Sequence, residues 1–169
     1  TTMGVNKNFS IFFLGIVIVG ILLLSLTPTF YGHLRVDHYG QYIEHVKVFL
    51  QDKSLANLGY NEYQPMAVLF FVSLSPFYVY SNYNIDWYIY GLYLVNIVLI
   101  VAAAFLIYAL KHNFTNIFIF GLIVLLTGPI ILNRFELLVF VALAVSILFF
   151  IKQHHFWSGF FMSIAILTK

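Results

Sequence analysis

Residues 87–110 read WYIYGLYLVNIVLIVAAAFLIYAL, a run without a charged side chain that is long enough to cross a lipid bilayer. Trp87, Tyr88, Tyr90 and Tyr93 gather at one end of the run, as aromatic side chains do at a membrane–water interface. The stretch therefore predicts a transmembrane helix over residues 87–110.

The composition of the whole chain has the same character. Of the 169 residues, 62% are hydrophobic and 8% are charged, whereas soluble domains carry about 25% charged residues. This small number of charged residues cannot cover the surface of a soluble fold. The apolar surface must therefore face the lipid of a membrane. We expect a multi-pass integral protein of the cell (plasma) membrane, with membrane lipids as partners. The formal net charge is +2 with no basic run, and nucleic acid is not expected as a partner.

Further apolar stretches predict an all-α bundle of five to six membrane helices. A span over 9–27 is favoured over a cleaved signal peptide, because its apolar run is long and Ser25 to Thr29 makes a poor cleavage site. The remaining predicted membrane helices cover 66–80, 117–132, 137–151 and 156–169. The last of them reaches Lys169, so we expect this single transmembrane domain to be the N-terminal portion of a larger one.

The stretch 66–80 leaves the topology open, because Ser73, Ser75 and Pro76 interrupt it. It either crosses as a thin span or re-enters the membrane. If it crosses, Lys111 and Lys152 share a side with residues 30–64; if it does not, they share a side with Lys7. The positive-inside rule favours the second arrangement.

The polar segment 30–64 separates two apolar regions and holds four of the six acids: Asp37, Glu44, Asp52 and Glu62. Apolar residues recur in it at helical spacing, while polar ones occupy another face. The apolar set is Val36, Tyr39, Ile43, Val46 and Leu50, and the polar set is Asp37, Gln41, Glu44 and His45. This pattern predicts an amphipathic helix along the membrane surface.

Asp37 is the first acid after the first span and is the candidate catalytic residue. Partial desolvation near the membrane would raise the pKa of its carboxyl and make it a general base near neutral pH. It would then take a proton from a sugar hydroxyl, and Glu44 would assist. The alternative is that both are solvated charges on a surface helix.

Two more polar stretches are candidate substrate-binding sites. Glu62 and Tyr63 lie in Tyr60-Asn61-Glu62-Tyr63-Gln64-Pro65, a mixture of aromatic and polar groups suited to sugars, although tyrosine is also common at membrane borders. Arg134 and Glu136 interrupt apolar sequence, where an ionisable group is costly and often functional. Arg134 suits a lipid-linked phosphate. The alternative is a wetted interhelical turn, and Lys169 allows the same two interpretations. No histidine spacing defines a metal site, and metal dependence stays open.

The layout resembles the GT-C glycosyltransferases, membrane enzymes that take sugar from a polyprenyl-phosphate carrier. Arg35-Val36-Asp37-His38-Tyr39 corresponds to their acidic motif early in the first outer loop. Tyr63-Gln64-Pro65-Met66, Asn133-Arg134-Phe135-Glu136, Trp157-Ser158-Gly159 and Leu167-Thr168-Lys169 resemble short motifs of glycosyltransferase family 87, the mannosyltransferase-like branch. Gln64 and Glu136 depart from that pattern, which usually has Pro and Asp there.

The resemblance implies an inverting transfer of a sugar, mannose in that branch, from a polyprenyl-phosphate donor to a lipid or glycan acceptor. Asp37 would activate the acceptor hydroxyl. Arg35 and His38, which stand on either side of Asp37 in the sequence, would contact the substrate. Arg134 or Lys169 would face the donor phosphate, and the polyprenyl-phosphate sugar is the donor substrate, with a divalent metal left open. The competing interpretations are a transporter or channel component, a non-catalytic membrane scaffold, or a carbohydrate polymerase or ligase of another family. A transporter built from inverted repeats would show paired broken helices, and the sequence shows none.

Overall fold

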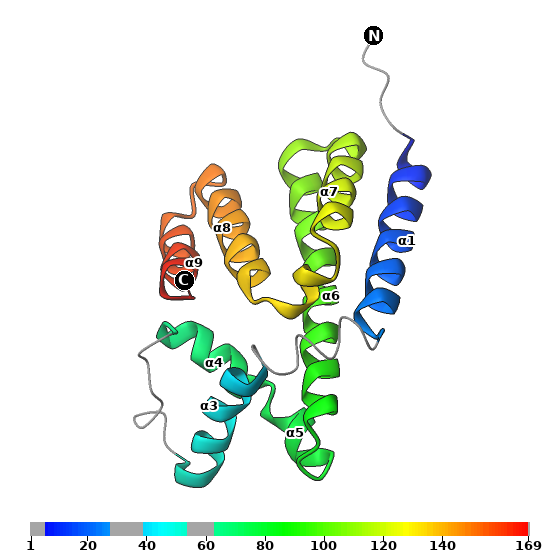
Figure 1. Cartoon of the computed structure of the whole chain (residues 1–169). Helices are drawn as coiled ribbons and strands as arrows, with labels where there is room; N and C mark the ends of the chain where they lie inside the picture. Colours follow the sequence, from blue (N-terminus) through cyan, green and yellow to red (C-terminus); the bar gives the residue numbers. More distant parts are fainter. Residues whose placement is uncertain (1–5, 28–38, 54–62, 169) are drawn as a thin grey trace.

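The computed structural model describes residues 6–27, 39–53 and 63–168, and in these ranges the chain is all-helical, without a β-strand. Figure 1 shows a bundle with a smaller group of helices below it. The elements are α1 (Lys7–Ser25), α3 (Tyr39–Asp52), α4 (Pro65–Ser73), α5 (Ser75–Tyr80), α6 (Ile85–Lys111), α7 (Phe114–Thr127), the 3-10 helix η1 (Gly128–Asn133), α8 (Glu136–Ile151) and α9 (His155–Thr168).

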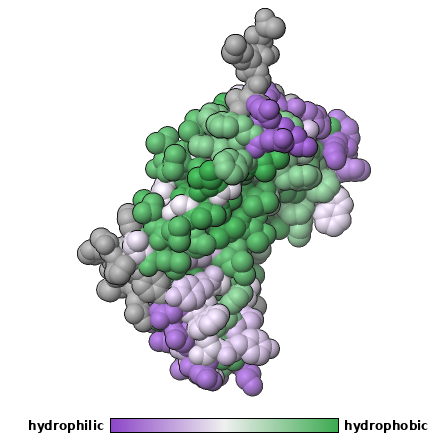
Figure 2. Space-filling view, turned by 90° about the vertical axis from the view of Figure 1, so that its right-hand side faces the viewer, coloured by the Kyte–Doolittle hydropathy of each residue, from purple (hydrophilic) through white to green (hydrophobic). Residues whose placement is uncertain are grey.

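Three helical stretches of the described chain are long and apolar enough to cross a membrane. They are α1, the apolar part of α6, and α7 continued through η1. The unit α4–α5 and the helices α8 and α9 are apolar but shorter. Figure 2 shows a hydrophobic band with hydrophilic residues at either end. These features are compatible with a membrane protein; three helical stretches of the described chain reach spanning length, and the predicted count of five to six spans is not confirmed.

Helices α1 and α7 pack side by side and run in the same direction. The ammonium group of Lys7 lies 5.7 Å from the ring centre of Phe114, and the rings of Phe13 and Phe118 are 4.8 Å apart. Gly121 allows this approach, since a Cβ there would lie 3.1 Å from the Phe13 ring. The first turn of α1 therefore shares one end of the molecule with the α6–α7 connection (Figure 1).

The chain turns back between α7 and α8 against the middle of α6. At the end of α7, Gly128 has φ 58°, which lies in the positive region that glycine tolerates, and Pro129 follows. The turn is held by Asn96, a fully buried residue of α6. Its side-chain amide donates hydrogen bonds to the backbone oxygens of Leu132 (2.8 Å) and Arg134 (3.1 Å). This contact fixes the height of Arg134 along α6.

Helices α8 and α9 form a closely packed hairpin. The buried hydroxyl of Ser146 on α8 donates to the backbone oxygen of Ser158 on α9 at 2.8 Å. Ala142 and Ala144 are also buried on α8, and such small side chains let helix backbones approach closely in membranes. The hairpin also brings α9 against α4.

The stretch 66–80, whose course the sequence left open, is broken into two short helices. Leu74 ends α4 and precedes α5, and Pro76 stands in the first turn of α5. Proline has no N–H and disfavours a continuous helix through this point. Helix α4 packs against α3, and α5 packs against α6. Figure 1 shows both short helices with α3 at the end of the molecule opposite the first turn of α1.

Candidate functional site

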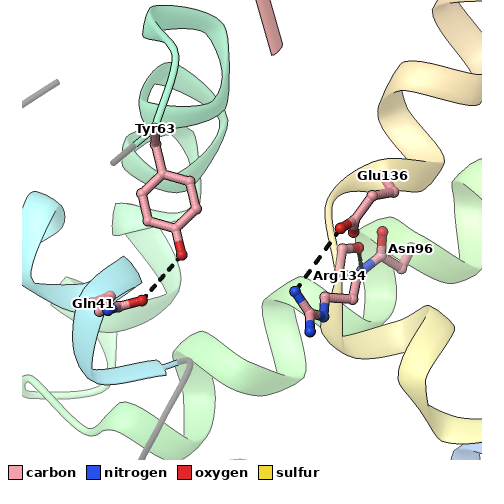
Figure 3. A network of polar contacts seen from close by, with 5 residues as sticks. All are labelled: Gln41, Tyr63, Asn96, Arg134 and Glu136. Carbon is pink, nitrogen blue, oxygen red and sulfur yellow. Dashed lines mark hydrogen bonds and ion pairs between the residues drawn. The ribbon is translucent and has the colours of Figure 1, made fainter. Parts of the chain in front are cut away.

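The structure brings three of the predicted site residues into one region. Tyr63, Arg134 and Glu136 lie around the beginning of α8, next to the surface helix α3 (Figure 3). Glu44 is exposed on α3 and takes no part in the contacts that follow. The other predicted residues, Arg35, Asp37, His38, Glu62 and Lys169, lie outside the described residues.

An aromatic cluster joins α3 to the start of α8. It consists of Tyr42, His45, Tyr63, Phe71 and Phe135. The rings of Tyr42 and Phe71 stack at 4.1 Å between centres, and Phe135 meets Phe71 edge-on at 5.5 Å. Phe135 also lies 5.8 Å from Tyr63, and Tyr63 lies 5.9 Å from His45. Since Phe135 stands between Arg134 and Glu136 in the chain, these contacts hold both charged residues close to α3.

The cluster also carries polar groups. The Tyr63 hydroxyl donates a hydrogen bond of 3.1 Å to the side-chain oxygen of Gln41 (Figure 3). Burial raises the pKa of the Tyr42 hydroxyl well above its usual range, and nearby Tyr63 raises it further, while Arg134 opposes the shift. The Tyr42 hydroxyl therefore stays protonated at neutral pH and can act as a hydrogen-bond donor rather than a base.

Arg134 and Glu136 form a loose ion pair at the first turn of α8. Their nearest atoms are 3.9 Å apart, and the two side chains are 42% and 55% exposed. A pair so open contributes at most about 1 kcal/mol to stability. The guanidinium of Arg134 is thus only weakly engaged within the described chain, and its forked N–H groups can bind an anion with two parallel hydrogen bonds.

An apolar groove between α7 and α8 ends at this pair. One part, of about 400 Å³, includes Phe120, Ile123 and Phe140 in its lining, and the adjoining part, of about 390 Å³, includes Arg134. The two parts share Ile131, Glu136 and Leu137. The groove is therefore lined mainly by apolar side chains and ends at the Arg134–Glu136 pair, whose guanidinium can bind the anionic headgroup of a lipid.

Several residues of this region were not identified from the sequence. Tyr42, Phe71 and Phe135 read as ordinary apolar residues, because their importance depends on contacts between distant segments. Asn96 carried a usable signal, since an amide within the long apolar run 87–110 must find a partner inside the membrane. An amide at this position predicts that Asn96 makes a polar contact inside the protein. It does not predict that the contact is with the backbone of the turn before α8.

No group of three His, Asp or Glu residues within the described ranges is placed to hold a metal ion. The candidate site is therefore defined by the aromatic cluster, the Arg134–Glu136 pair and the α7–α8 groove. No protein-family model, curated protein or solved structure matches this chain.

Proposed function

We propose that the protein is a membrane glycosyltransferase that moves a sugar, mannose according to the family it resembles, from a polyprenyl-phosphate donor to a lipid or glycan acceptor. The observation that supports this most is the position of Arg134, at the polar end of an apolar groove and beside an aromatic cluster. The apolar groove suits a lipid chain, the Arg134 guanidinium suits the phosphate, and the aromatic cluster suits the sugar, in the same sequence as in the donor molecule.

The donor lipid would lie in the α7–α8 groove with its phosphate at Arg134. Because the isoprenoid chain already lies in hydrocarbon, the groove would hold it through packing contacts rather than by removing it from water. The guanidinium would neutralise the charge that develops on the phosphate as the sugar leaves. Glu136, next to Arg134, would keep the guanidinium turned toward the site when no donor is bound.

The sugar would lie between the phosphate and α3, beside the partly exposed rings of His45, Tyr63 and Phe135 and the exposed Gln41 amide. The Tyr42 and Phe71 rings are buried and would support these contacts rather than make them. Aromatic faces pack against the apolar C–H face of a pyranose, while amides and hydroxyls bond its edge. Asp37 precedes the first residue of α3 by two positions. A base in this segment would be tethered to the aromatic cluster through α3.

In the proposed step, the Asp37 carboxylate takes the proton of an acceptor hydroxyl. The hydroxyl oxygen forms a bond to the anomeric carbon while the bond from that carbon to the phosphate oxygen breaks. Polyprenyl phosphate leaves with the bonding electron pair, and attack from the opposite face inverts the anomeric centre.

Helices α8 and α9 would cross the membrane with the three long spans, and α4–α5 would stay at the polar end.

The test is sugar transfer from a polyprenyl-phosphate sugar in membranes that hold the full-length protein. Asp37→Asn should lower kcat about 100-fold or more, as the loss of a general base does. Arg134→Gln should lower kcat/KM for the donor by a similar factor. Lys152→Gln, at an exposed lysine after α8, is the matched control and should transfer normally. Transfer by Asp37→Asn at the wild-type rate would reject the proposed function.

A further inference from the structure

A second pocket lies at the α5–α6 hairpin, away from Arg134. It has a volume of about 460 Å³ and is lined by Pro76, Phe77, Tyr80, Ser81, Asn82 and Trp87. None of these residues belongs to the aromatic cluster or to the α7–α8 groove. In Figure 2 the hairpin forms part of the pale and hydrophilic lower end of the molecule.

The floor of this pocket is fixed by a glycine. A Cβ on Gly91 would lie 2.5 Å from the Phe77 ring, so only glycine allows Phe77 to pack directly on α6. Trp87 is four residues before Gly91 and stands on the same face of the helix. Trp87 and Phe77 therefore form adjacent walls of one hollow.

The turn at the pocket edge is held in a costly conformation. Asn82 and Tyr83 have φ of 56° and 64°, in the left-handed region, which asparagine tolerates but which costs a residue such as Tyr83 about 1–2 kcal/mol. The backbone N–H of Tyr83 donates to the Tyr78 oxygen at 2.9 Å, and the Ser81 hydroxyl donates to the same oxygen at 3.0 Å. Asn84 then caps α6 through the N–H of Asp86 at 2.8 Å. The pocket edge is thus held rigidly in place.

The side chains around this rigid hollow are aromatic and polar together. Tyr80 is 89% exposed and Trp87 is 55% exposed, so both rings offer uncovered faces. The Asn82 amide is exposed beside them and can both donate and accept hydrogen bonds. A pyranose matches this combination, because it has one apolar C–H face and a rim of hydroxyls.

The hairpin also extends beyond the apolar layer. Helix α6 has 27 residues, a length of about 40 Å at about 1.5 Å per residue, whereas the hydrocarbon core of a bilayer is about 30 Å thick. With Lys111 at one border, the first turns of α6 lie past the other border. The pocket therefore faces the layer in which the sugars of a membrane-bound glycan are found.

We propose that this pocket binds a pyranose unit of the glycan acceptor, stacked on Trp87 and hydrogen-bonded by Asn82. This inference rests on the proposed function for the identity of the glycan as acceptor, but its binding chemistry can be tested separately. The pocket would hold a sugar distant from the reacting hydroxyl, and so favour acceptors that are already glycosylated.

The chain has two tryptophans, so Trp157→Phe leaves Trp87 as the only tryptophan reporter. With this variant in nanodiscs, mannotriose or maltotriose should give a saturable change in Trp87 fluorescence. Mannitol, which has the hydroxyls without the ring face, should give none. Asn82→Ala in the same background should weaken trisaccharide binding at least tenfold. The absence of a saturable change with either trisaccharide, or an equal change with mannitol, would overturn the inference.

A second measurement separates sugar binding from membrane anchoring. If the pocket binds sugar, trisaccharide should protect Trp87 from aqueous acrylamide, and headgroup spin-labelled lipid should quench it weakly. Strong quenching by the lipid label that trisaccharide does not relieve would make Trp87 an interfacial anchor and overturn the inference.

The transfer assay separates the two proposals. Asn82→Ala should raise KM for a glycosylated acceptor without changing KM for the donor. Normal transfer without trisaccharide binding at Trp87 would reject the pocket alone. Trisaccharide binding at Trp87 in a protein that transfers no sugar would reject the proposed transferase and keep the pocket.

Discussion

At the scale of single residues, Asn96 has the clearest structural task. Its buried amide holds the backbone oxygens of Leu132 and Arg134, and these carbonyls are where the chain turns back toward α8. A carbonyl deprived of its donor inside a membrane protein is costly because no water replaces it. The position of Arg134 therefore depends on a residue 38 positions earlier in the chain.

We predict that Asn96→Leu, which keeps the volume and removes the donor, destabilises the protein by about 1–3 kcal/mol. Asn96→Asp should destabilise it as well, since a carboxylate facing two carbonyl oxygens donates no N–H. Asn116→Leu, at the third residue of α7 and only partly buried, is the control. Thermal unfolding in detergent measures the effect, and equal Tm values for the Asn96 variants and the wild type would contradict it.

The site shows what can be read from single residues. Arg134, Glu136 and Tyr63 stand out because charged or hydrogen-bonding groups next to apolar runs are unusual, and the structure places all three around the start of α8. Tyr42 and Phe71 carry no such signal. Their stacking at 4.1 Å requires that α3 and α4 pack together, which depends on tertiary contacts that no local pattern encodes.

At the scale of elements, the packing of α5 on α6 depends on Gly91. An added Cβ would lie 2.5 and 2.6 Å from two Phe77 ring atoms and 3.1 Å from the Phe77 Cβ. The last contact involves an atom close to the backbone, so rotation of the Phe77 ring does not relieve the clash. One of the two helices has to move.

We predict that Gly91→Ala lowers Tm by several degrees, because overpacking costs about 1–3 kcal/mol and outweighs the better helix propensity of alanine. Gly20→Ala is the matched control, since a Cβ on Gly20 in α1 meets nothing within 4 Å. It should leave Tm unchanged or slightly raised. A Tm for Gly91→Ala as high as that of Gly20→Ala would show that α5 does not pack on α6 in this way.

Periodicity predicted the long elements well and their ends less well. The run 87–110 corresponds to α6, and the predicted helix over 117–132 begins earlier, at Phe114, because the Asn113 side chain accepts from the N–H of Thr115 at 2.9 Å. The same run changes to a 3-10 helix at Gly128, where Gly128-Pro129 interrupts the α-helical hydrogen bonds. Hydrophobicity identifies an apolar run, but caps and breakers decide its geometry.

At the scale of the whole molecule, Lys7 and Lys152 lie at one end, while Lys47 and Lys53 lie on and just after α3 at the other. Lys7 lies beside Phe114, just after the end of α6, and α8 runs back to that same end before Lys152 (Figure 1). Helix α3 and the α5–α6 hairpin lie at the opposite end. Because α4–α5 is broken and lies at that opposite end, we predict the topology in which residues 66–80 do not cross.

We therefore predict that Lys7 and Lys152 face the cytoplasm and that α3 faces outward, since lysines in short segments beside membrane helices are retained inside. The chain has no cysteine, so single cysteines report without background. An impermeant thiol reagent should label Gln51→Cys, on α3, in intact cells. It should label His154→Cys, after α8, only once the membrane is opened. Labelling of His154→Cys alone in intact cells would reverse this topology and place the proposed sugar site on the wrong face for an outward-facing acceptor. Labelling of both positions would contradict the prediction that they lie on opposite sides.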